Sequence, residues 1–110
     1  MKRLEGKVAI VTGGGQGIGQ AMCETFAREG AEITVVDLNA KKAINVAKDI
    51  CRSGGNAIGL KVDISKSIQV REMVGTVMEK FGQIDILVNN AGVYSLYNTR
   101  DCPEEEWDRI

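Results

Sequence analysis

The sequence contains no histidine among its 110 residues. This absence excludes the Ser-His-Asp triad, a histidine general base and a histidine metal ligand together. Cysteine is also sparse: Cys23, Cys51 and Cys102 are odd in number and widely spaced, and no Cys-x-x-Cys pair occurs. We therefore interpret the cysteines as reduced thiols with mainly structural roles, and we predict no metal site.

Strong net charge and long apolar runs are missing too. The formal net charge is −1, whereas a nucleic-acid-binding domain normally presents a basic face, so we expect no nucleic-acid partner. No apolar run approaches the roughly 20 residues that a membrane span requires. The charged segment 1–7 has no signal-peptide core behind it, because Gly13 interrupts the apolar run that follows. We expect no membrane partner and a cytoplasmic location.

Apolar patterning predicts strands that alternate with helices. Strands are expected at residues 7–12, 32–37, 57–62 and 84–88, with segments of helical spacing between them. The apolar stripes expected to face the core are Ile18, Ala21, Met22, Thr25 and Phe26 in the first helix, Ala40, Ala43, Ile44, Ala47, Ile50 and Cys51 in the second, and Val70, Met73, Val74, Val77, Met78 and Phe81 in the third. The short links require a parallel sheet with right-handed crossovers and helices on both faces.

The pattern changes after Gly92. Residues 93–100 are expected to form a loop, and Asp101-Cys102-Pro103 followed by acidic residues predicts the start of a new helix. The sequence ends at Ile110, about two turns into that helix. We interpret the chain as one domain or part of one, and the interrupted helix as a sign of truncation.

Glycine is the residue type that carries most information, because it is concentrated in one turn. Residues 12–19 have the sequence Thr-Gly-Gly-Gly-Gln-Gly-Ile-Gly and stand between the first strand and the first helix. Glycine accepts positive φ and lets a ligand approach the backbone, while the helix that follows directs free N–H groups at an anion. This context is typical of a dinucleotide-binding turn. The alternative is a tight turn without a ligand.

A carboxylate follows this turn at a position suited to ribose recognition. Asp37 closes the second strand, where such a group accepts hydrogen bonds from the adenosine ribose hydroxyls. It would repel the 2′-phosphate of NADP, the next residues 38–40 are not basic, and Gln16 in the turn is uncharged. The pattern therefore favours NAD over NADP. The alternative role of Asp37 is to cap the next helix.

Two further groups end strands at the same edge of the predicted sheet. Asp63 follows the third strand, where it either binds a ligand or caps the helix that begins near Ser65. Asn89, Asn90 and Gly92 follow the fourth strand. The carboxyl ends of parallel strands form the crevice in which ligands bind, whereas asparagine side chains also bridge neighbouring backbone. Both roles remain open for Asn89.

Together these motifs resemble those of the short-chain dehydrogenase/reductase family. The matching residues run in order along essentially the whole chain. They are Thr12-Gly13-x-x-x-Gly17-x-Gly19, Asp37, Asp63-Ile64, Asn89-Asn90-Ala91-Gly92 and the helix start at residues 104–109. The resemblance implies an α/β fold with a Rossmann-type doubly wound parallel sheet, of which four strands are present in the order 3-2-1-4. Residues 1–110 would be the NAD-binding, N-terminal portion of a larger domain.

The resemblance also implies specific contacts with the cofactor. Residues 13–19 would face the pyrophosphate and nicotinamide, Asp37 the adenosine ribose and Asn90 the nicotinamide-side ribose. Asp63 would bind the adenine amino group, with Ile64 beside the ring. Thr12 and Asn89 would mainly tie the first strand to the fourth. The implied cofactor-binding residues are Gly13, Gln16, Gly17, Ile18, Gly19, Asp37, Asp63, Ile64 and Asn90.

The chain departs from the family in lacking its catalytic group, an Asn, a Ser and a Tyr-x-x-x-Lys pair. Tyr94 and Tyr97 are followed four residues later by Asn98 and Asp101, and no lysine occurs after Lys80. We predict no catalytic residue in the chain, which alone would be inactive. The resemblance implies that the complete enzyme is a homo-oligomer that interconverts a small secondary alcohol and a ketone by hydride transfer.

Two alternatives come from other functional classes. The chain could be a non-catalytic nucleotide-binding module or partner subunit, because it binds a cofactor in this interpretation without the residues for chemistry. A methyltransferase-type domain also uses a glycine-rich first turn and an acid after the second strand. The Thr-Gly opening and the Asn-Asn-Ala-Gly segment at residues 89–92 weigh against the methyltransferase.

Overall fold

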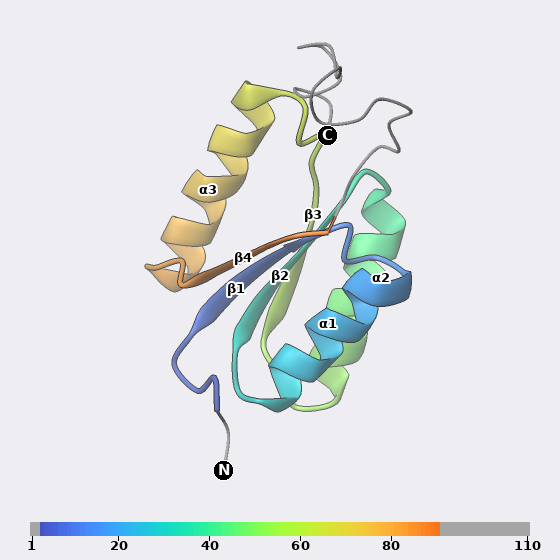
Figure 1. Ribbon diagram of the computed structural model, residues 1–110, viewed down its shortest axis with the longest axis vertical. Coiled ribbons are helices and arrows are strands. Elements are labelled where there is room, and N and C mark those ends of the chain that lie inside the picture. Colours follow the sequence, from blue (N-terminus) through green and yellow to red (C-terminus); the bar gives the residue numbers. More distant parts are fainter. Residues whose placement is uncertain (1–2, 91–110) are drawn as a thin grey trace, which may run out of the picture.

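The computed structural model describes residues 3–90. The elements in this range are β1 (Val8–Thr12), α1 (Gly17–Arg28), β2 (Glu32–Asp37), α2 (Ala40–Arg52), β3 (Ala57–Lys61), α3 (Ser67–Phe81) and β4 (Ile86–Asn89). The strands pair in parallel in the order β3-β2-β1-β4, with α1 and α2 on one face and α3 on the other (Figure 1). The predicted Rossmann-type sheet is confirmed. The helix predicted from residue 101 lies outside the described residues.

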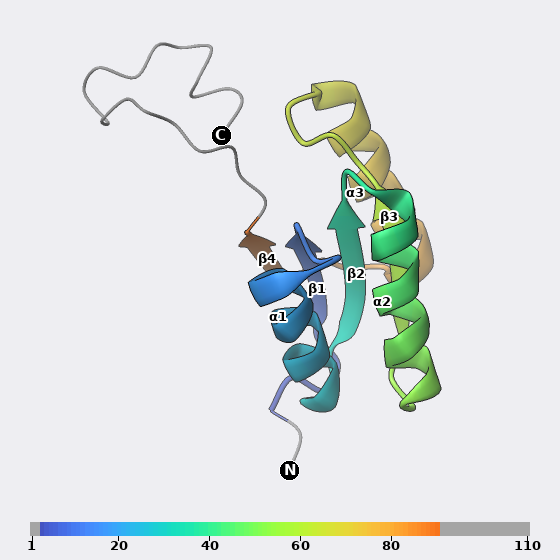
Figure 2. The same ribbon diagram turned by 90° about the vertical axis from the view of Figure 1, so that its right-hand side faces the viewer.

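The core lies on both faces of the central strand β1, whose five residues are all buried. Side chains alternate between the faces of a strand. Ala9 and Val11 belong to a cluster under α1 and α2, whereas Val8 and Ile10 pack in a second cluster under α3. Figure 2 shows α1 lying toward β1 and α2 toward β3. Of the helices in residues 3–90, none has both the length and the apolar character needed to cross a membrane.

The buried faces of the helices differ from the predicted stripes. Gly19 and Cys23 are the buried residues of α1, whereas Ile18 is 71% exposed. Ile44 of α2 and Met78 of α3 are exposed as well. The physical reason in α1 is that small residues let the helix lie close to the sheet. A prediction based on large apolar residues therefore finds the helix but misplaces its inner face.

The fourth strand begins at Ile86, two residues later than predicted. The Asp85 Oδ2 atom accepts the backbone N–H of Val8 at 2.8 Å, while the backbone N–H of Asp85 donates to the Val8 carbonyl at 2.9 Å. The hydrogen bond from the Val8 N–H holds the pKa of the Asp85 carboxyl below its ordinary value. A side chain therefore completes the pairing of β1 with the segment that leads into β4.

Candidate nucleotide-binding site

The carboxyl ends of β1, β2 and β4 meet at one edge of the sheet (Figure 1). The glycine turn, residues 13–16, follows β1, Asp37 ends β2 and Asn90 follows β4. The strand order reverses between β1 and β4, because the chain moves from β1 outward to β3 and then returns to the other side. Open parallel sheets bind their ligands at such a reversal point.

The glycine turn holds a backbone path that other residues would strain. Gly13 and Gly17 have φ values of 65° and 59°, in the left-handed region. Gly19 is constrained by contact instead: a Cβ atom there would collide with the Gly13 carbonyl and lie 2.7 Å from the Asn90 Nδ2 atom. The turn is also fixed to β2, because the Gly14 N–H donates to the Val36 carbonyl at 3.0 Å.

The start of α1 has the properties of an anion site. The helix begins at Gly17, its N-cap residue Gln16 makes no side-chain capping bond, and its first turn contains no acidic residue. The first backbone N–H groups are therefore available to a ligand at the positive end of the helix dipole. Gln16 and Ile18 expose their side chains beside these groups. Residues 16–19 can thus bind a phosphate by backbone contacts.

Cys23 lies beneath the same turn and is structural. It is fully buried, and its Sγ atom is 4.0 Å from the Gly14 carbonyl oxygen. Burial raises the pKa of the Cys23 thiol to about 12, so the group stays neutral. Cys51 is exposed, with its Sγ atom 3.4 Å from the Ala57 carbonyl oxygen. Cys102 lies outside the described residues.

The Asp37 carboxylate links the glycine turn to the loop before α2. Its Oδ2 atom accepts the Gly15 N–H at 3.1 Å, and its Oδ1 atom accepts the Asn39 N–H at 3.0 Å. Asn39, and not Asp37, is the N-cap of α2, because its side chain accepts the Lys42 N–H. The carboxylate is therefore held against the turn, and each oxygen retains a lone pair for a further donor.

The Asp63 carboxylate accepts hydrogen bonds from Ser65, two residues further along the same loop. Its Oδ1 atom accepts the Ser65 hydroxyl at 2.6 Å and the Ser65 N–H at 3.0 Å. These two hydrogen bonds, the hydroxyl first, lower the pKa of the Asp63 carboxyl. The N-cap of α3 is Lys66, so Asp63 shapes the turn before the helix. Ile64 is half-buried and packs against the core cluster under α3.

The asparagines after β4 contact the first strand. The Thr12 hydroxyl donates to the Val88 carbonyl at 3.2 Å and lies 3.3 Å from the Asn89 Oδ1 atom. This contact confirms that Thr12 and Asn89 tie β1 to β4. The exposed Asn90 side chain donates from Nδ2 to the Gly13 carbonyl at 3.4 Å, which brings it to the glycine turn. Residues 91 and 92 of the same motif lie outside the described residues.

The family assignment rests on a comparison with known proteins. The family model for short chain dehydrogenase matches residues 7–110, nearly the whole chain. The chain belongs to the short-chain dehydrogenase family.

Relatives of this chain within the family carry oxidoreductase names. An uncharacterized oxidoreductase of Methylorubrum extorquens is 40% identical over all of this chain and 45% of its own length. A cyclopentanol dehydrogenase of Comamonas testosteroni is 38% identical over all of this chain and 44% of its own length. The solved hydroxysteroid dehydrogenase of Escherichia coli is 43% identical with a TM-score of 0.80, over 83% of this chain and 39% of that one. The chain thus spans less than half the length of the curated relatives it matches.

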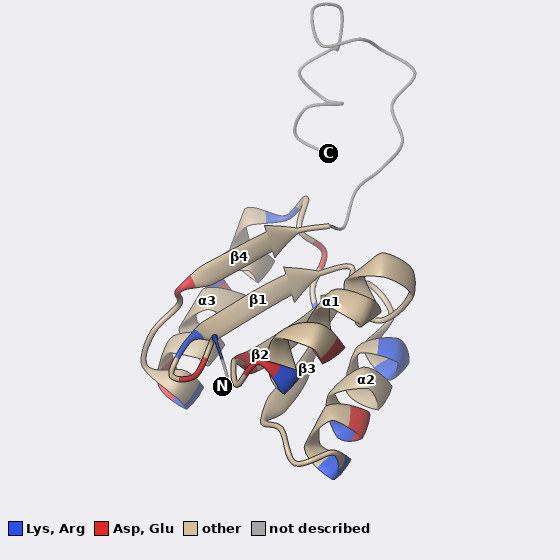
Figure 3. Ribbon diagram, turned by 60° about the horizontal axis from the view of Figure 1, so that its bottom comes forward, with Lys and Arg blue, Asp and Glu red and all other residues tan. Residues whose placement is uncertain are grey.

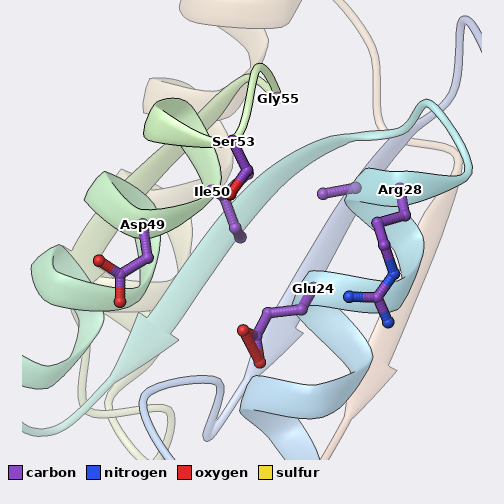
Figure 4. A pocket seen from close by; sticks show the side chains of 7 residues that line it. Glu24, Arg28, Asp49, Ile50, Ser53 and Gly55 are labelled. Carbon is purple, nitrogen blue, oxygen red and sulfur yellow. The ribbon is translucent and has the colours of Figure 1, made fainter.

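The chain also has a cavity away from the nucleotide edge. A volume of about 150 Å³ lies between the last turns of α1 and α2, lined by Glu24, Arg28, Asp49 and Ser53 among others (Figure 4). These turns lead into the amino ends of the strands, so the cavity is at the opposite end of the sheet from Asp37. Within residues 3–90, no group of three or more Cys, Asp or Glu side chains is arranged to hold a metal ion.

Of the predicted site residues, the structure brings the glycine turn, Asp37 and Asn90 together through the bonds above. The Asp63 carboxylate instead accepts its hydrogen bonds from Ser65, and the Asp63 backbone N–H donates to the Gln69 Oε1 atom of α3 at 2.8 Å. Sequence reasoning missed Lys42, whose Nζ atom donates to the Gln16 Oε1 atom of the turn. Lys42 stands five positions after Asp37, outside the uncharged residues 38–40 from which NAD is predicted. The signal that could have found Lys42 is its place in the first turn of α2, directly after the loop that leaves β2.

Proposed function

We propose that residues 1–110 form the NAD-binding, N-terminal portion of an oxidoreductase domain that interconverts a small secondary alcohol and a ketone. The observation that carries the proposal is the Asp37 carboxylate at the end of β2, whose Oδ2 atom is held 3.1 Å from the Gly15 nitrogen of the glycine turn. A carboxylate there favours the two hydroxyls of an NAD ribose over the 2′-phosphate of NADP. Family membership supports a nicotinamide cofactor, and relatives named as alcohol dehydrogenases support the substrate class.

The residues of the turn fit a dinucleotide. Gly13 and Gly17 have the positive φ of a phosphate-binding loop, and the α1 N–H groups are free of side-chain caps. In the proposed complex these N–H groups bind the pyrophosphate, with the side chains of Gln16 and Ile18 beside it. Asp37 orients the adenosine ribose. Asp63 and Ile64 remain proposed for the adenine, and Asn90 for the nicotinamide-side ribose.

The chemical contribution of the chain is binding and orientation. When bound, NAD supplies the acceptor for a hydride from the alcohol carbon. The α1 dipole offsets pyrophosphate charge, and the Asn90 contact with Gly13 fixes the turn beside β4. No Tyr-x-x-x-Lys pair occurs in the 110 residues, so the proton-transfer group is not assigned to this chain. A homo-oligomeric complete enzyme, the cytoplasmic location and the lack of nucleic-acid or membrane partners stay predictions.

Fluorescence titration of the chain tests the cofactor. We expect NADH to bind more tightly than NADPH, because Asp37 accepts ribose hydroxyls and repels phosphate. S-adenosylmethionine is the control for the methyltransferase interpretation and is expected not to bind. A lack of NADH binding at millimolar concentration contradicts the proposal, and so does saturable binding of S-adenosylmethionine.

A non-catalytic nucleotide-binding module is the second candidate, because the contacts described at the site, from the α1 N–H groups to Asp37, all serve binding. Both candidates bind NADH, so titration does not separate them. The coding sequence beyond residue 110 does. A continuation that encodes Ser and Tyr-x-x-x-Lys supports the oxidoreductase, whereas a stop codon supports the module. Turnover of a secondary alcohol by the 110-residue chain alone would show that the reaction requires neither the Ser nor the Tyr-x-x-x-Lys pair.

A further inference from the structure

Lys42 reaches from α2 onto the glycine turn. Its backbone N–H donates to the Asn39 Oδ1 atom at 3.1 Å, which fixes the residue in the first turn of the helix. Its side chain extends to Gln16, where Nζ donates to Oε1. Figure 3 shows basic residues at the end of α2 that lies nearest the start of α1. An ammonium group therefore stands at the turn that the sequence shows as uncharged.

Lys42 and Asp37 flank the same glycine. A Cβ atom built on Gly15 would lie 2.7 Å from the Lys42 Cβ atom and 2.8 Å from the Asp37 Oδ2 atom. The Asp37 Oδ2 atom also accepts a hydrogen bond from the Gly15 backbone N–H. The carboxylate and the stem of the lysine thus border one small volume, and the lysine has four flexible carbons with which to move its charge.

The two charges act in opposite directions on a 2′-phosphate. A phosphate monoester carries a charge of about −1.5 to −2 at pH 7, which Asp37 repels at the ribose that it would hold. An ammonium group binds phosphate as a compact point charge. Gln16 is a neutral partner for Lys42, so the lysine can leave it for a stronger acceptor without breaking an ion pair.

We propose that Lys42 is a second determinant of nucleotide choice, which binds the 2′-phosphate and partly offsets the repulsion from Asp37. The inference rests on the proposed dinucleotide function of the same site. The chain then accepts NADPH with measurable affinity despite Asp37. The opposing role is that Lys42 only anchors Gln16 and the turn, in which case it affects both nucleotides equally.

Lys42→Gln separates these roles in a titration with NADH and NADPH. We expect the variant to bind NADPH about threefold to fivefold more weakly, the upper part of the range for an exposed charge contact, and NADH within twofold of the unaltered chain. The matched control is Lys41→Gln, which removes the exposed neighbouring charge and should change neither affinity. Unchanged NADH affinity also shows that the variant is folded.

Asp37→Asn provides an independent arm, because it keeps the side-chain shape and removes the repelling charge. It also gives up one of the two backbone hydrogen bonds of Asp37, since an amide nitrogen does not accept. We expect it to tighten NADPH binding severalfold, and Lys42→Gln in the same chain to reverse most of that gain. The Lys42 proposal is overturned if Lys42→Gln lowers the affinities for NADH and NADPH equally. It is also overturned if Lys42→Gln leaves the NADPH affinity unchanged both in the unaltered chain and in Asp37→Asn. In either case, binding of NADH by the unaltered chain still supports the proposed cofactor site. Failure of the unaltered chain to bind either nucleotide overturns both proposals.

Discussion

At the scale of single residues, the core contains a polar group that weakens it. Thr34 is fully buried in β2, and its hydroxyl has no hydrogen-bond partner within residues 3–90. A buried hydroxyl without a partner costs free energy, and an isosteric methyl group removes that cost. We expect Thr34→Val to raise the free energy of unfolding in urea by about 1 kcal/mol. The exposed control Thr76→Val should change it little, and a loss of stability in Thr34→Val would contradict the assignment.

Two glycines make a matched pair for the binding turn. Gly19→Ala places a methyl group against the Gly13 carbonyl and the Asn90 side chain. The turn must then move, so we expect NADH affinity to fall at least tenfold, which is about 1.4 kcal/mol. Gly75, within α3, has no heavy atom within 4 Å of a built Cβ. Gly75→Ala should instead raise the free energy of unfolding by roughly 0.5–1 kcal/mol, with NADH binding unchanged. Tight NADH binding by Gly19→Ala would contradict the close-packed turn.

At the scale of elements, the order of strands and helices could be predicted from apolar spacing, because each segment has to bury one face. Which face of α1 is buried could not be predicted in this way, because the small residues Gly19 and Cys23 set the distance of the helix from the sheet. The glycine turn at residues 13–19 could be predicted, because its motif lies within one short stretch of sequence. The contact of Lys42 with Gln16 depends on how α2 leaves β2, a tertiary feature that short-range patterns do not contain.

The pairing of β1 with β4 predicts a pH dependence. The pKa of Asp85 is lowered in the folded chain, chiefly by the Val8 N–H. Its contribution to stability is therefore complete above the unfolded pKa of about 4 and is lost as the pH falls through the lower folded value. Asp85→Asn should reduce the free energy of unfolding at pH 7 and flatten its decline in acid. The measurement is urea unfolding between pH 2 and pH 7.

The control for this series is Asp49→Asn. Asp49 pairs with Arg52 at 3.3 Å on the surface of α2, with both side chains more than half exposed. Such pairs contribute little, so the stability of this variant should follow that of the unaltered chain at each pH. The free energy of unfolding of Asp85→Asn could instead fall in acid as steeply as that of the unaltered chain. That result would show that the Val8 contact contributes nothing to the pH dependence of stability.

At the scale of the whole molecule, the described sheet has an apolar edge. Within residues 3–90, β4 pairs only with β1, and Leu87 is 62% exposed on it. Val74 and Met78 of α3 are exposed as well. An open apolar edge strand is a template for association. We expect the isolated 110-residue chain to show concentration-dependent sedimentation, and Leu87→Lys to reduce it. A monodisperse monomer with a sharp, concentration-independent thermal transition would contradict this expectation.

The central claim is that the turn after β1, together with Asp37 and Asn90, forms one nucleotide site. The most direct test follows the backbone amide NMR signals of the chain during addition of NAD. We predict shifts concentrated at residues 13–19, at Asp37 and at Asn90, with the residues around the cavity of Glu24 and Asp49 unchanged. Shifts centred on that cavity, or none at saturating NAD, would contradict the account.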